Sequence, residues 1–598
     1  MNSPQKTWLL RQSPIDVSQE HIYELANDTG ISEEIIKLLV LRGVSDKQGI
    51  KDFLSPSLSQ LPRPHLMKGM AEAVKILSES LKSRRPITIY GDFDADGVTS
   101  TTVLYLFFSE LNVPLNYFIP DRLTDGYGLN SGAVKNIYET NKQQWGEPGI
   151  LITVDCGISD DEVVDGAKKL GFTVIITDHH KPPEKLPPAD AILNPLQPEC
   201  DFPCKNLAGV GVAFYLILGL RSELIENGHW PEDKIPNLKS YMDIPAIGTV
   251  ADQVQLTDCN RIIVKAGLEI LNQGNRIGLQ KLLNTTKGYE SEITSGDIAF
   301  RIAPRINAIG RVGSAQKAVE LLSTRIPEDA EKLANELEEA NKARKNIEAN
   351  IFDEALQMVS SDTLKDTFSL LLYKSDWHQG VLGIVASRLT DRYNRPAILL
   401  TDCLPKDSPE MGKLAKGSGR SIEGVDIHHA VSTCQEILER FGGHKGAVGL
   451  TLAKENIDTF RQQFDRIIGE QLENNLQPPS LMIDIETTLE VLSDKNFISA
   501  YSLLAPFGSG NPKPVFCLTG QKLTNPRLVG NNHLRFTIME KGNSMNGIGF
   551  GFGEFIHEAQ NSLMDIAFAL KLNSYMGQAK WEIHLTALRP TNIDIVSP

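Results

Sequence analysis

Residues 87–97 read Ile-Thr-Ile-Tyr-Gly-Asp-Phe-Asp-Ala-Asp-Gly, a short apolar run followed by aspartates at alternate positions. The β-branched and aromatic residues predict a buried strand at 87–90, and the chain that follows predicts a helix over 97–111. The same alternation continues with strands expected at 115–119, 150–154 and 172–176 and a helix at 160–170. Strands that alternate with helices predict a mostly parallel sheet covered by helices on both faces.

The chain is too long for a single hydrophobic core, because its 598 residues exceed the usual size of one domain. Residues 327–359 predict one long helix, since Pro327 suits a first turn and acidic residues follow it. Changes in pattern divide the rest. We expect a helical segment at 1–55, a parallel-sheet domain at 56–315, a connecting helix at 316–360, a smaller α/β domain at 361–474 and a β-rich module at 475–598.

The C-terminal module contains short β-like runs at 534–539, 566–572 and 581–588, with Gly- and Asn-rich turns between them. This spacing predicts a small β-barrel of the OB type, which commonly binds single strands, and it leaves a β-sandwich as an alternative. Several aromatic and basic side chains could stack on bases or meet phosphates, and the sequence singles out none of them: Phe516, Phe536, Tyr575, Trp581, Arg527, Arg535 and Lys580.

Composition restricts the class of protein only loosely. A net charge of −15 does not favour a nucleic-acid substrate, but charge acts locally, so it excludes none. No apolar run is long enough to span a membrane, and residues 1–11 do not resemble a signal peptide, so we expect a cytoplasmic location and no membrane partner. The seven scattered cysteines predict reduced thiols, with a zinc site at Cys200 and Cys204 as the weaker alternative.

Three polar clusters follow directly after predicted strands. They are the aspartates of residues 92–96, then Asp155, then Asp178-His179-His180. In a parallel sheet the carboxyl ends of neighbouring strands share one edge, where ligands bind. We therefore expect Asp94, Asp96, Asp155, His179 and His180 to converge.

Ionised carboxylates that crowd together need compensating positive charge. Carboxylate and imidazole ligands together suit Mn²⁺ or Mg²⁺, and a pair of such ions is a known device for displacement at phosphorus. Two simpler interpretations are helix capping by the aspartates and a calcium loop. The calcium loop is disfavoured because Val103 stands where its bidentate glutamate is expected.

The three clusters resemble the motifs of the DHH phosphoesterase superfamily. Residues 91–97 resemble the first motif, 153–157 the second, 178–180 the signature that names the superfamily, and 248–252 the fourth. The resemblance implies five metal ligands: Asp94, Asp96, Asp155, His179 and Asp252. It also implies that Asp155 bridges two ions and that His180 contacts the scissile phosphate or assists proton transfer.

One position departs from the superfamily pattern. Many members have a histidine four residues before the first ligand aspartate, and Tyr90 occupies that position here. One metal position is therefore expected to be weaker, to rely on water, or to be supported by Asp92.

Further segments narrow the resemblance to the RecJ family of exonucleases. They are residues 304–311, 377–389, 417–421 and 441–444, of which the last two are similar to a DHH-associated C-terminal domain. Glycine lets the backbone approach a phosphate, while hydroxyl and guanidinium groups bind its oxygens. The resemblance thus implies that Arg311, Ser418 and Arg420 hold a terminal 5′-phosphate and that His444 binds the substrate backbone nearby.

The resemblance implies a 5′→3′ exonuclease that hydrolyses single-stranded DNA with two Mn²⁺ or Mg²⁺ ions and releases 5′-mononucleotides during DNA repair and recombination. Its fold would be a DHH catalytic domain at 56–315, a DHH-associated domain at 361–474 and an OB-fold domain at 475–598. A monomer is expected, with a helicase and a single-strand-binding protein as further partners. The alternatives are a nano-RNase or cyclic-dinucleotide phosphodiesterase of the same superfamily and a non-catalytic single-strand-binding replication factor.

Overall fold

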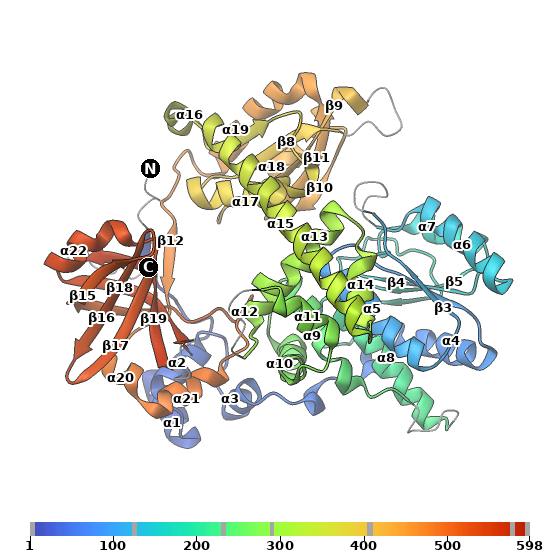
Figure 1. Ribbon diagram of the computed structural model, residues 1–598, viewed down its shortest axis with the longest axis horizontal. Coiled ribbons are helices and arrows are strands. Elements are labelled where there is room, and N and C mark those ends of the chain that lie inside the picture. Colours follow the sequence, from blue (N-terminus) through green and yellow to red (C-terminus); the bar gives the residue numbers. More distant parts are fainter. Residues whose placement is uncertain are drawn as a thin grey trace. The chain divides into compact units, whose positions relative to one another are not determined.

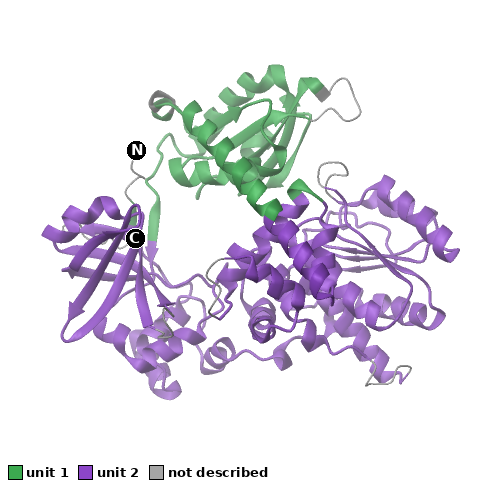
Figure 2. Cartoon of the chain, viewed as in Figure 1, with its two compact units in different colours: residues 1–7, 311–313, 339–481 green, residues 8–310, 314–338, 482–598 purple. Residues whose placement is uncertain are grey.

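The computed structural model describes residues 6–121, 128–228, 235–286, 292–403, 411–573 and 580–591. The chain forms two compact units (Figure 2). Unit 1 contains residues 1–7, 311–313 and 339–481, and unit 2 contains residues 8–310, 314–338 and 482–598. None of the described helices is both long enough and apolar enough to cross a membrane.

A five-stranded parallel sheet organises the first part of unit 2, as the sequence predicts (Figure 1). Its strand order is β3-β2-β4-β5-β6. The strands are β2 (Ile87–Tyr90), β3 (Leu115–Phe118), β4 (Ile150–Val154), β5 (Thr173–Thr177) and β6 (Ala191–Leu193). The strand β6 is an addition to the expected set, because three residues give too short an apolar run to be recognised from sequence.

Helices cover both faces of this sheet, which explains why its central strands are apolar throughout. On one face, α6 (Ser131–Trp145) and α7 (Asp161–Lys169) share a core with Leu151, Val174 and Ile176. The other helices that contact the strands are α4 (Met70–Ser83), α5 (Ala95–Glu110) and α8 (Gly209–Glu226). The helix α5 begins two residues before the predicted start, at the aspartates themselves.

A helical layer completes this part of unit 2. It consists of α9 (Asp243–Ala251), α10 (Asp258–Gln273), α11 (Ile277–Asn284), α12 (Ser295–Asp297), the π-helix η5 (Ile298–Ile302), α13 (Ala303–Val312) and α14 (Gln316–Ser323). The last two residues of α13 belong to unit 1. The predicted long helix is present as α15 (Pro327–Met358), whose residues up to 338 belong to unit 2 and whose later residues belong to unit 1.

The prediction of reduced thiols is wrong for two cysteines. Cys204, before α8, and Cys259, in the first turn of α10, form a disulfide with their Cα atoms 6.1 Å apart. The pair is separated by 55 residues, so only the packing of α10 against the segment before α8 brings the two sulfurs together. This bond also removes Cys204 from the alternative zinc site, while Cys200 is a free buried thiol.

Unit 1 contains the second, smaller α/β fold that the sequence predicts. Its sheet has the order β10-β11-β9-β8-β7, in which only the β7–β8 pair is parallel. Its elements are α16 (Ser361–Asp366), β7 (Leu370–Tyr373), α17 (Leu382–Tyr393), β8 (Ala397–Asp402), β9 (Leu414–Arg420), α18 (Ile427–Thr433), β10 (Arg440–His444), β11 (Ala447–Ala453) and α19 (Ile457–Gln471).

The C-terminal part of unit 2 is a β-rich module built on a seven-stranded sheet of order β13-β14-β18-β19-β17-β16-β15. The strands are β13 (Ile485–Glu486), β14 (Phe516–Gln521), β15 (Thr524–Val529), β16 (His533–Glu540), β17 (Asn543–Phe550), β18 (Met564–Asn573) and β19 (Lys580–Pro590). Its helices are α20 (Leu489–Ser493), α21 (Lys495–Leu503) and α22 (Ile556–Asn561). Lys541 and Gly542 both have positive φ in the β16–β17 hairpin, as a two-residue turn of this hand requires.

The N-terminal helices pack on this C-terminal module. These are α1 (Gln19–Thr29), α2 (Glu33–Val40) and α3 (Lys47–Leu54), and Leu38 and Leu39 share a core with Phe497 and Phe568. The strand β1 (Thr7–Leu10) also pairs with β12 (Ser480–Ile483). A segment that reads as an independent lead-in is therefore part of the C-terminal core.

The aromatic candidates of this module separate into two groups. Phe516 and Phe536 are buried in the core, and Trp581 packs against it. Tyr575 lies outside the described residues. Core packing thus accounts for the three aromatic candidates that the structure describes.

Candidate metal centre and basic cluster

The carboxyl ends of β2, β4 and β5 place the first side chains of the site. In register, Tyr90 lies beside Thr153, and Val154 beside Thr177, so the residues that follow these strands emerge at one edge. Asp155 follows β4 with a φ of 60°, a left-handed conformation that is uncommon for residues other than glycine. Such strained backbone is found at functional sites, where it fixes the direction of a side chain.

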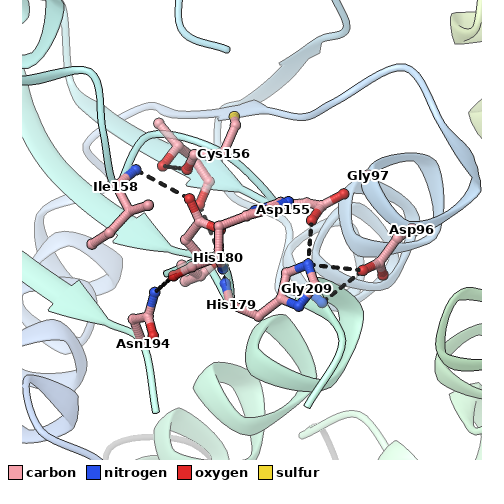
Figure 3. Close-up of polar contacts among 12 residues, drawn as sticks. Asp96, Gly97, Asp155, Cys156, Ile158, His179, His180, Asn194 and Gly209 are labelled. Atoms are coloured by element: carbon pink, nitrogen blue, oxygen red, sulfur yellow. Dashed lines mark hydrogen bonds and ion pairs between the residues drawn. The ribbon is translucent and has the colours of Figure 1, made fainter. Parts of the chain in front are cut away.

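Backbone amides hold the aspartates of the first motif. The Asp94 carboxylate caps α5 by accepting the N–H groups of Asp96 at 2.9 Å and Gly97 at 3.1 Å. The Asp96 carboxylate accepts the N–H groups of Gly209 at 2.6 Å and Val210 at 2.8 Å, at the start of α8 (Figure 3). The helix N-terminus stabilises this buried charge. Asp94 therefore caps a helix, and both Asp94 and Asp96 can still direct carboxylate oxygens toward a metal ion.

Gly209 is required by the packing of α8 against the site. A Cβ atom at this position would lie 2.7 Å from Asp155 Oδ1, which is closer than non-bonded atoms approach. Without a side chain, the helix start can donate to Asp96 while Asp155 faces it. This role could not be inferred from the sequence, because residue 209 is more than fifty positions from Asp155.

His179 lies at the centre of the carboxylates, as Figure 3 shows for Asp96 and Asp155. Its Nε2 atom is 3.2 Å from Asp155 Oδ1, 3.7 Å from Asp252 Oδ2 and 3.9 Å from Asp96 Oδ2. Asp252 comes from the C-terminal end of α9. The structure thus brings together the five predicted ligands, the metal cluster of Asp94, Asp96, Asp155, His179 and Asp252.

Within this region, potential ligand atoms form three groups whose members lie within 4.8 Å of one another. One group is Asp96, His179 and Asp252; another is Asp155, His179 and His180; the third is Asp92, Asp94 and Asp155. Asp155 Oδ1 and His179 Nε2 are buried and have no hydrogen-bond partner. Buried polar atoms are rarely left so, and an oxygen and an imidazole nitrogen in this position fit a divalent cation.

The electrostatics of the cluster support the same conclusion. Burial and the neighbouring aspartates raise the pKa of Asp155 and of Asp96 well above the ordinary value. Burial and the charge of Asp94 raise the pKa of Asp252 to about 7. Burial and the charge of His180 lower the pKa of His179 to about 4, so its imidazole is neutral at pH 7. Carboxylates that resist ionisation beside a neutral imidazole form a site in which a divalent cation would balance the charge.

Asp178 and His180 form a pair beside the metal cluster. Asp178 Oδ1 lies 2.7 Å from His180 Nδ1 and also accepts the backbone N–H groups of His179 and His180. Burial alone would raise the pKa of Asp178, but the hydrogen bond and charge of His180, together with the backbone N–H groups of His180 and Ile158, lower that pKa. Although burial opposes it, the same bond raises the pKa of His180 to about 9. The sequence identified His180 but not the orienting role of Asp178, which its place in the same motif could have suggested.

A second cluster lies within unit 1 and consists of Arg311, Ser418, Arg420 and His444, here called the basic cluster. Arg420 Nη1 donates to Ser418 Oγ at 3.3 Å, and Arg311 Nη1 donates to the Gly380 carbonyl. A Cβ atom at Gly383, in the first turn of α17, would lie 2.8 Å from Arg420 Nη2 and 2.9 Å from Ser418 Oγ. Three of the predicted substrate-binding residues therefore gather around the start of one helix.

His444 lies farther along the same sheet. In register, His444 pairs with Ala447, which pairs with Arg420, so the side chains of His444 and Arg420 emerge on the same face. Two strand spacings separate them by about 10 Å. His444 is exposed at the end of β10, where its Nδ1 accepts the Gly446 N–H at 3.1 Å.

Three family models match the chain. The DHH family N-terminal domain matches residues 86–249, the DHHA1 domain matches 366–470 and the RecJ OB domain matches 483–587. These matches confirm the predicted fold class: a parallel-sheet DHH domain, a smaller α/β domain and a C-terminal OB domain. The predicted boundaries at 55, 315, 360 and 474 stay predictions.

Similar proteins are known over most of the chain. The single-stranded-DNA-specific exonuclease RecJ of Bacillus subtilis is 37% identical over 90% of this chain, which spans 65% of that protein's length. RecJ of Dickeya dadantii is 35% identical over 92% of this chain and 96% of its own length. Among solved structures, Thermus thermophilus RecJ in complex with Mn²⁺ superposes with a TM-score of 0.80 at 28% identity, covering 98% of this chain and 80% of that one.

Proposed function

The chain belongs to the RecJ family of single-stranded-DNA-specific exonucleases, and we propose that it hydrolyses single-stranded DNA from the 5′ end and releases 5′-mononucleotides. Its cofactors are divalent cations, Mn²⁺ or Mg²⁺. The observation that carries the proposal is the convergence of four aspartates and a neutral histidine at one sheet edge, with a buried carboxylate oxygen that has no hydrogen-bond partner.

The metal cluster would hold the ions through Asp94, Asp96, Asp155, His179 and Asp252. When bound, such ions lower the pKa of a water molecule and stabilise the charge that develops on the phosphate. Asp155 and His179 each belong to two of the three ligand groups, and of the two only the Asp155 carboxylate has a second oxygen to offer, so Asp155 would be the residue shared between the ions. The amides of Gly209 and Val210 orient Asp96, and the left-handed backbone orients Asp155.

His180 is the catalytic proton carrier of the proposal. Its side chain is 45% exposed, in contrast to that of His179, which is 13% exposed. With a pKa of about 9 it is protonated at pH 7 and can donate a hydrogen bond to a phosphate oxygen or a proton to the leaving oxygen. Asp178 fixes the orientation of the ring through Nδ1.

The basic cluster would recognise the 5′ end. Arg311, Ser418 and Arg420 offer guanidinium and hydroxyl donors around the start of α17, whose helix dipole also favours an anion. His444 would contact the backbone of the strand about 10 Å away on the same face, a distance of the order of two strand spacings. Binding of the terminal phosphate in this way would position the 5′ end of the strand for exonucleolytic cleavage.

The C-terminal module would bind the rest of the strand. Phe550 is 57% exposed and its ring lies between His533, at 5.1 Å, and His584, at 5.7 Å. Arg535 lies on the adjacent strand β16, where it pairs with Ile548 of β17. Ile548 and Phe550 are two positions apart on β17, so Arg535 and Phe550 lie on the same face of the sheet. Exposed aromatic rings beside basic side chains are typical of surfaces on which bases stack.

The test offers three 5′-phosphorylated substrates of equal length: single-stranded DNA, the same DNA as a blunt duplex, and single-stranded RNA, each with Mn²⁺ or Mg²⁺. Mononucleotides should be released from the 5′ end of the single-stranded DNA and much more slowly from the duplex. Preference for short RNA or for a cyclic dinucleotide would replace the proposal with the nano-RNase or cyclic-dinucleotide phosphodiesterase alternative. Tight binding without cleavage would indicate a non-catalytic replication factor.

The cellular context is part of the same proposal. We propose that a helicase unwinds the duplex that supplies its single strands and that a single-strand-binding protein covers them. We therefore assign the chain to DNA repair and recombination in the cytoplasm, acting as a monomer. Sedimentation of the purified chain with and without single-stranded DNA tests the oligomeric state.

A further inference from the structure

The segment that follows Asp252 joins the metal cluster to α10, and its backbone is strained at both ends. Residues 253–257 are here called the linker. Gln253, its first residue, has a φ of 61°, and Asp258, at the start of α10, has a φ of 45°. Residues other than glycine adopt this left-handed conformation at a cost in free energy, and they keep it only where the surrounding structure fixes the chain. The path of the linker therefore depends on what packs against it.

A loop of the C-terminal module packs against the linker. It consists of residues 503–511, here called the docking loop. The Ser509 carbonyl accepts the Leu256 N–H at 2.7 Å. A Cβ atom at Gly508 would lie 2.7 Å from Leu256 Cδ1, and one at Gly510 would lie 3.0 Å from the Cβ atom of the residue before Leu256. The two glycines thus bring the docking loop into direct contact with the linker.

Arg261, in the first turn of α10, attaches the docking loop and is only 2% exposed. A guanidinium group has five N–H donors, and here each has a backbone carbonyl as its acceptor. The acceptors are the carbonyls of Phe53 at 2.8 Å, Leu503 at 3.0 Å, Leu504 at 3.1 Å, Ala505 at 2.9 Å and Pro506 at 3.4 Å. A lysine cannot reproduce this arrangement, because its ammonium group has three donors on a single atom.

Further buried polar groups fix the shape of the docking loop. Asn511 is fully buried, and its Nδ2 donates to the carbonyls of Leu504 and Pro506, each at 2.8 Å. Ser295, in α12, donates from Oγ to the Phe507 carbonyl at 2.7 Å. Buried polar groups that are paired in this way rigidify the chain around them. The docking loop is therefore a fixed surface against which the linker is held.

The linker is also connected to the amide groups that hold Asp96. Asn260 donates from Nδ2 to the Gln255 carbonyl at 2.9 Å and to the Asn206 carbonyl at 2.6 Å. Asn206 lies three positions before Gly209, whose N–H group donates to the Asp96 carboxylate. Two of the five proposed metal ligands are thus joined to the docking loop by short runs of contacts.

We propose that the docking loop positions Asp252 for metal binding, so that the C-terminal module contributes to catalysis as well as to strand binding. By fixing the linker, the loop fixes the end of α9 and with it the direction of the Asp252 carboxylate. Because they act through the linker, Arg261 and the loop residues are positioning residues. The inference rests on the proposed function, since it takes Asp252 as a ligand, and it extends that function by coupling the metal cluster to the C-terminal module.

A loop that only attached the C-terminal module would behave differently. Its disruption would raise the KM for long DNA, because the strand-binding module would be less firmly held, and would leave Mn²⁺ binding and kcat unchanged. Disruption of a positioning loop lowers kcat for every substrate. A trinucleotide is included because it is shorter than the roughly 4–16 nucleotides that one OB domain binds. The separate effects on KM and kcat therefore distinguish the two roles.

The experiment compares the full-length wild type with three variants. Arg261→Lys keeps the positive charge and loses the five-donor arrangement. Gly508→Ala removes no hydrogen-bonding group and adds a methyl group against Leu256. Arg589→Lys is the matched control, because Arg589 is also a buried arginine of unit 2 and pairs with Asp565 within the C-terminal module.

Three properties are measured for each protein. The number and affinity of bound Mn²⁺ ions come from the electron paramagnetic resonance of unbound Mn²⁺. Hydrogen exchange of the linker amides is followed in the metal-free chain. Values of kcat and KM are determined for a long single-stranded DNA and for the trinucleotide. Thermal unfolding verifies that each variant folds.

The wild type and Arg589→Lys should bind two Mn²⁺ ions. Arg261→Lys and Gly508→Ala should bind one ion with wild-type affinity and the other about 10-fold more weakly, the lower end of the loss caused by removing an outer-shell partner of a metal ligand. At a subsaturating Mn²⁺ concentration, kcat for the trinucleotide should fall by a similar factor. The linker amides should exchange faster in both variants, because the contacts that fix them are weakened.

Wild-type Mn²⁺ affinities and kcat in Arg261→Lys, with KM raised for long DNA alone, would overturn the proposal and leave the nuclease assignment unaffected. If Arg261→Lys does not fold, Gly508→Ala decides by the same criterion, because one methyl group against the end of a flexible leucine side chain leaves the fold intact. A wild type that bound no ion would instead contradict the proposed function itself, so the two failures are distinguishable.

Discussion

The metal cluster and the basic cluster both consist of charged side chains, yet they are stabilised in opposite ways. Asp96 and Asp155 are almost fully buried and carry charges of the same sign, and the histidine between them is neutral at pH 7. Ser418 and Arg420 are partly exposed on one face of β9 and are held by hydrogen bonds to one another and to the backbone. The metal cluster therefore needs bound cations to offset the repulsion among its carboxylates. The basic cluster remains hydrated and is stable without a bound phosphate.

The two clusters therefore contribute electrostatic free energy at different stages, the first on folding and the second on substrate binding. Repulsion among buried carboxylates raises their pKa values and is released when cations bind. An exposed arginine loses little hydration until a phosphate arrives, so its contribution appears only on binding. Removing a residue from the metal cluster should therefore affect both catalysis and the stability of the chain, and removing one from the basic cluster should affect substrate binding alone.

The largest effect is expected for Asp155→Ala. Loss of the bridging carboxylate should abolish cleavage, by roughly 10³-fold or more, as removal of a principal electrostatic contributor does. It should also lower the number of bound Mn²⁺ ions. Because the variant removes one of several repelling buried charges, the thermal midpoint of its metal-free form should equal or exceed that of the metal-free wild type. A lower midpoint or retained turnover would contradict the assigned role.

The second prediction concerns pH and metal together. The raised pKa values of Asp96 and Asp155, and that of about 7 for Asp252, mean that the folded chain binds more protons than the unfolded chain above about pH 4. The free energy of unfolding of the metal-free chain should therefore fall as the pH rises from about 5 to about 8. Below about pH 6.5, His179 has the opposite effect, because its lowered pKa makes the unfolded chain bind the additional proton. The three aspartates together outweigh this single histidine.

Divalent cations should reverse that loss. Mn²⁺ at a hundred times its dissociation constant adds about 2.7 kcal/mol for each ion that binds only the folded chain. Thermal midpoints measured at both pH values, with Mn²⁺ and with a chelator, test the expectation. A chelated chain that is as stable at pH 8 as at pH 5 would show that the cluster does not carry the repulsion inferred from its burial.

Arg420→Ala tests the basic cluster. Hydrogen bonds to charged groups contribute about 1.5–3 kcal/mol, which corresponds to a loss of roughly 10- to 150-fold in kcat/KM for DNA with a 5′-phosphate. DNA with a 5′-hydroxyl should be cleaved as by the wild type, and Mn²⁺ binding and stability should not change. Arg466→Ala, which removes an exposed ion pair with Glu470 in the same unit, is the control. Equal losses on both DNA ends would place the phosphate site elsewhere.

The sequence predicted that the side chains after β2, β4 and β5 converge, because a parallel sheet has a simple rule: residues that follow neighbouring strands share an edge. That rule located Asp94, Asp155 and His179 without any knowledge of packing. It could not locate the amides of Gly209 and Val210 that hold Asp96, or the Asn307 side chain that accepts the Ala95 N–H at 2.8 Å. These partners come from helices far along the chain, whose positions depend on tertiary packing.

The same reason explains the other omissions. The helices α1–α3 look like an independent segment because each has an ordinary amphipathic pattern, and nothing in that pattern names the C-terminal module as its partner. Arg261 of α10 likewise donates to the backbone carbonyls of Leu503, Leu504 and Ala505, an attachment between the DHH and OB parts of unit 2. Periodicity identifies a buried face, but it does not identify what covers it.

The smallest effect is expected for an exposed aromatic side chain of the C-terminal module, which belongs neither to the metal cluster nor to the basic cluster. Phe550→Ala removes the exposed ring between His533 and His584 on the OB sheet. Because stacking of one base contributes about 1–3 kcal/mol and a long strand has other contacts, we expect the lower end, about a fivefold weaker affinity for single-stranded DNA. Stacking releases no counterions, so the salt dependence of binding should match the wild type, whereas Arg420→Ala should reduce it.

Phe550→Leu, which keeps an apolar side chain without an aromatic face, should behave like Phe550→Ala. Wild-type affinity in both variants, measured by fluorescence anisotropy, would remove this face from the DNA path.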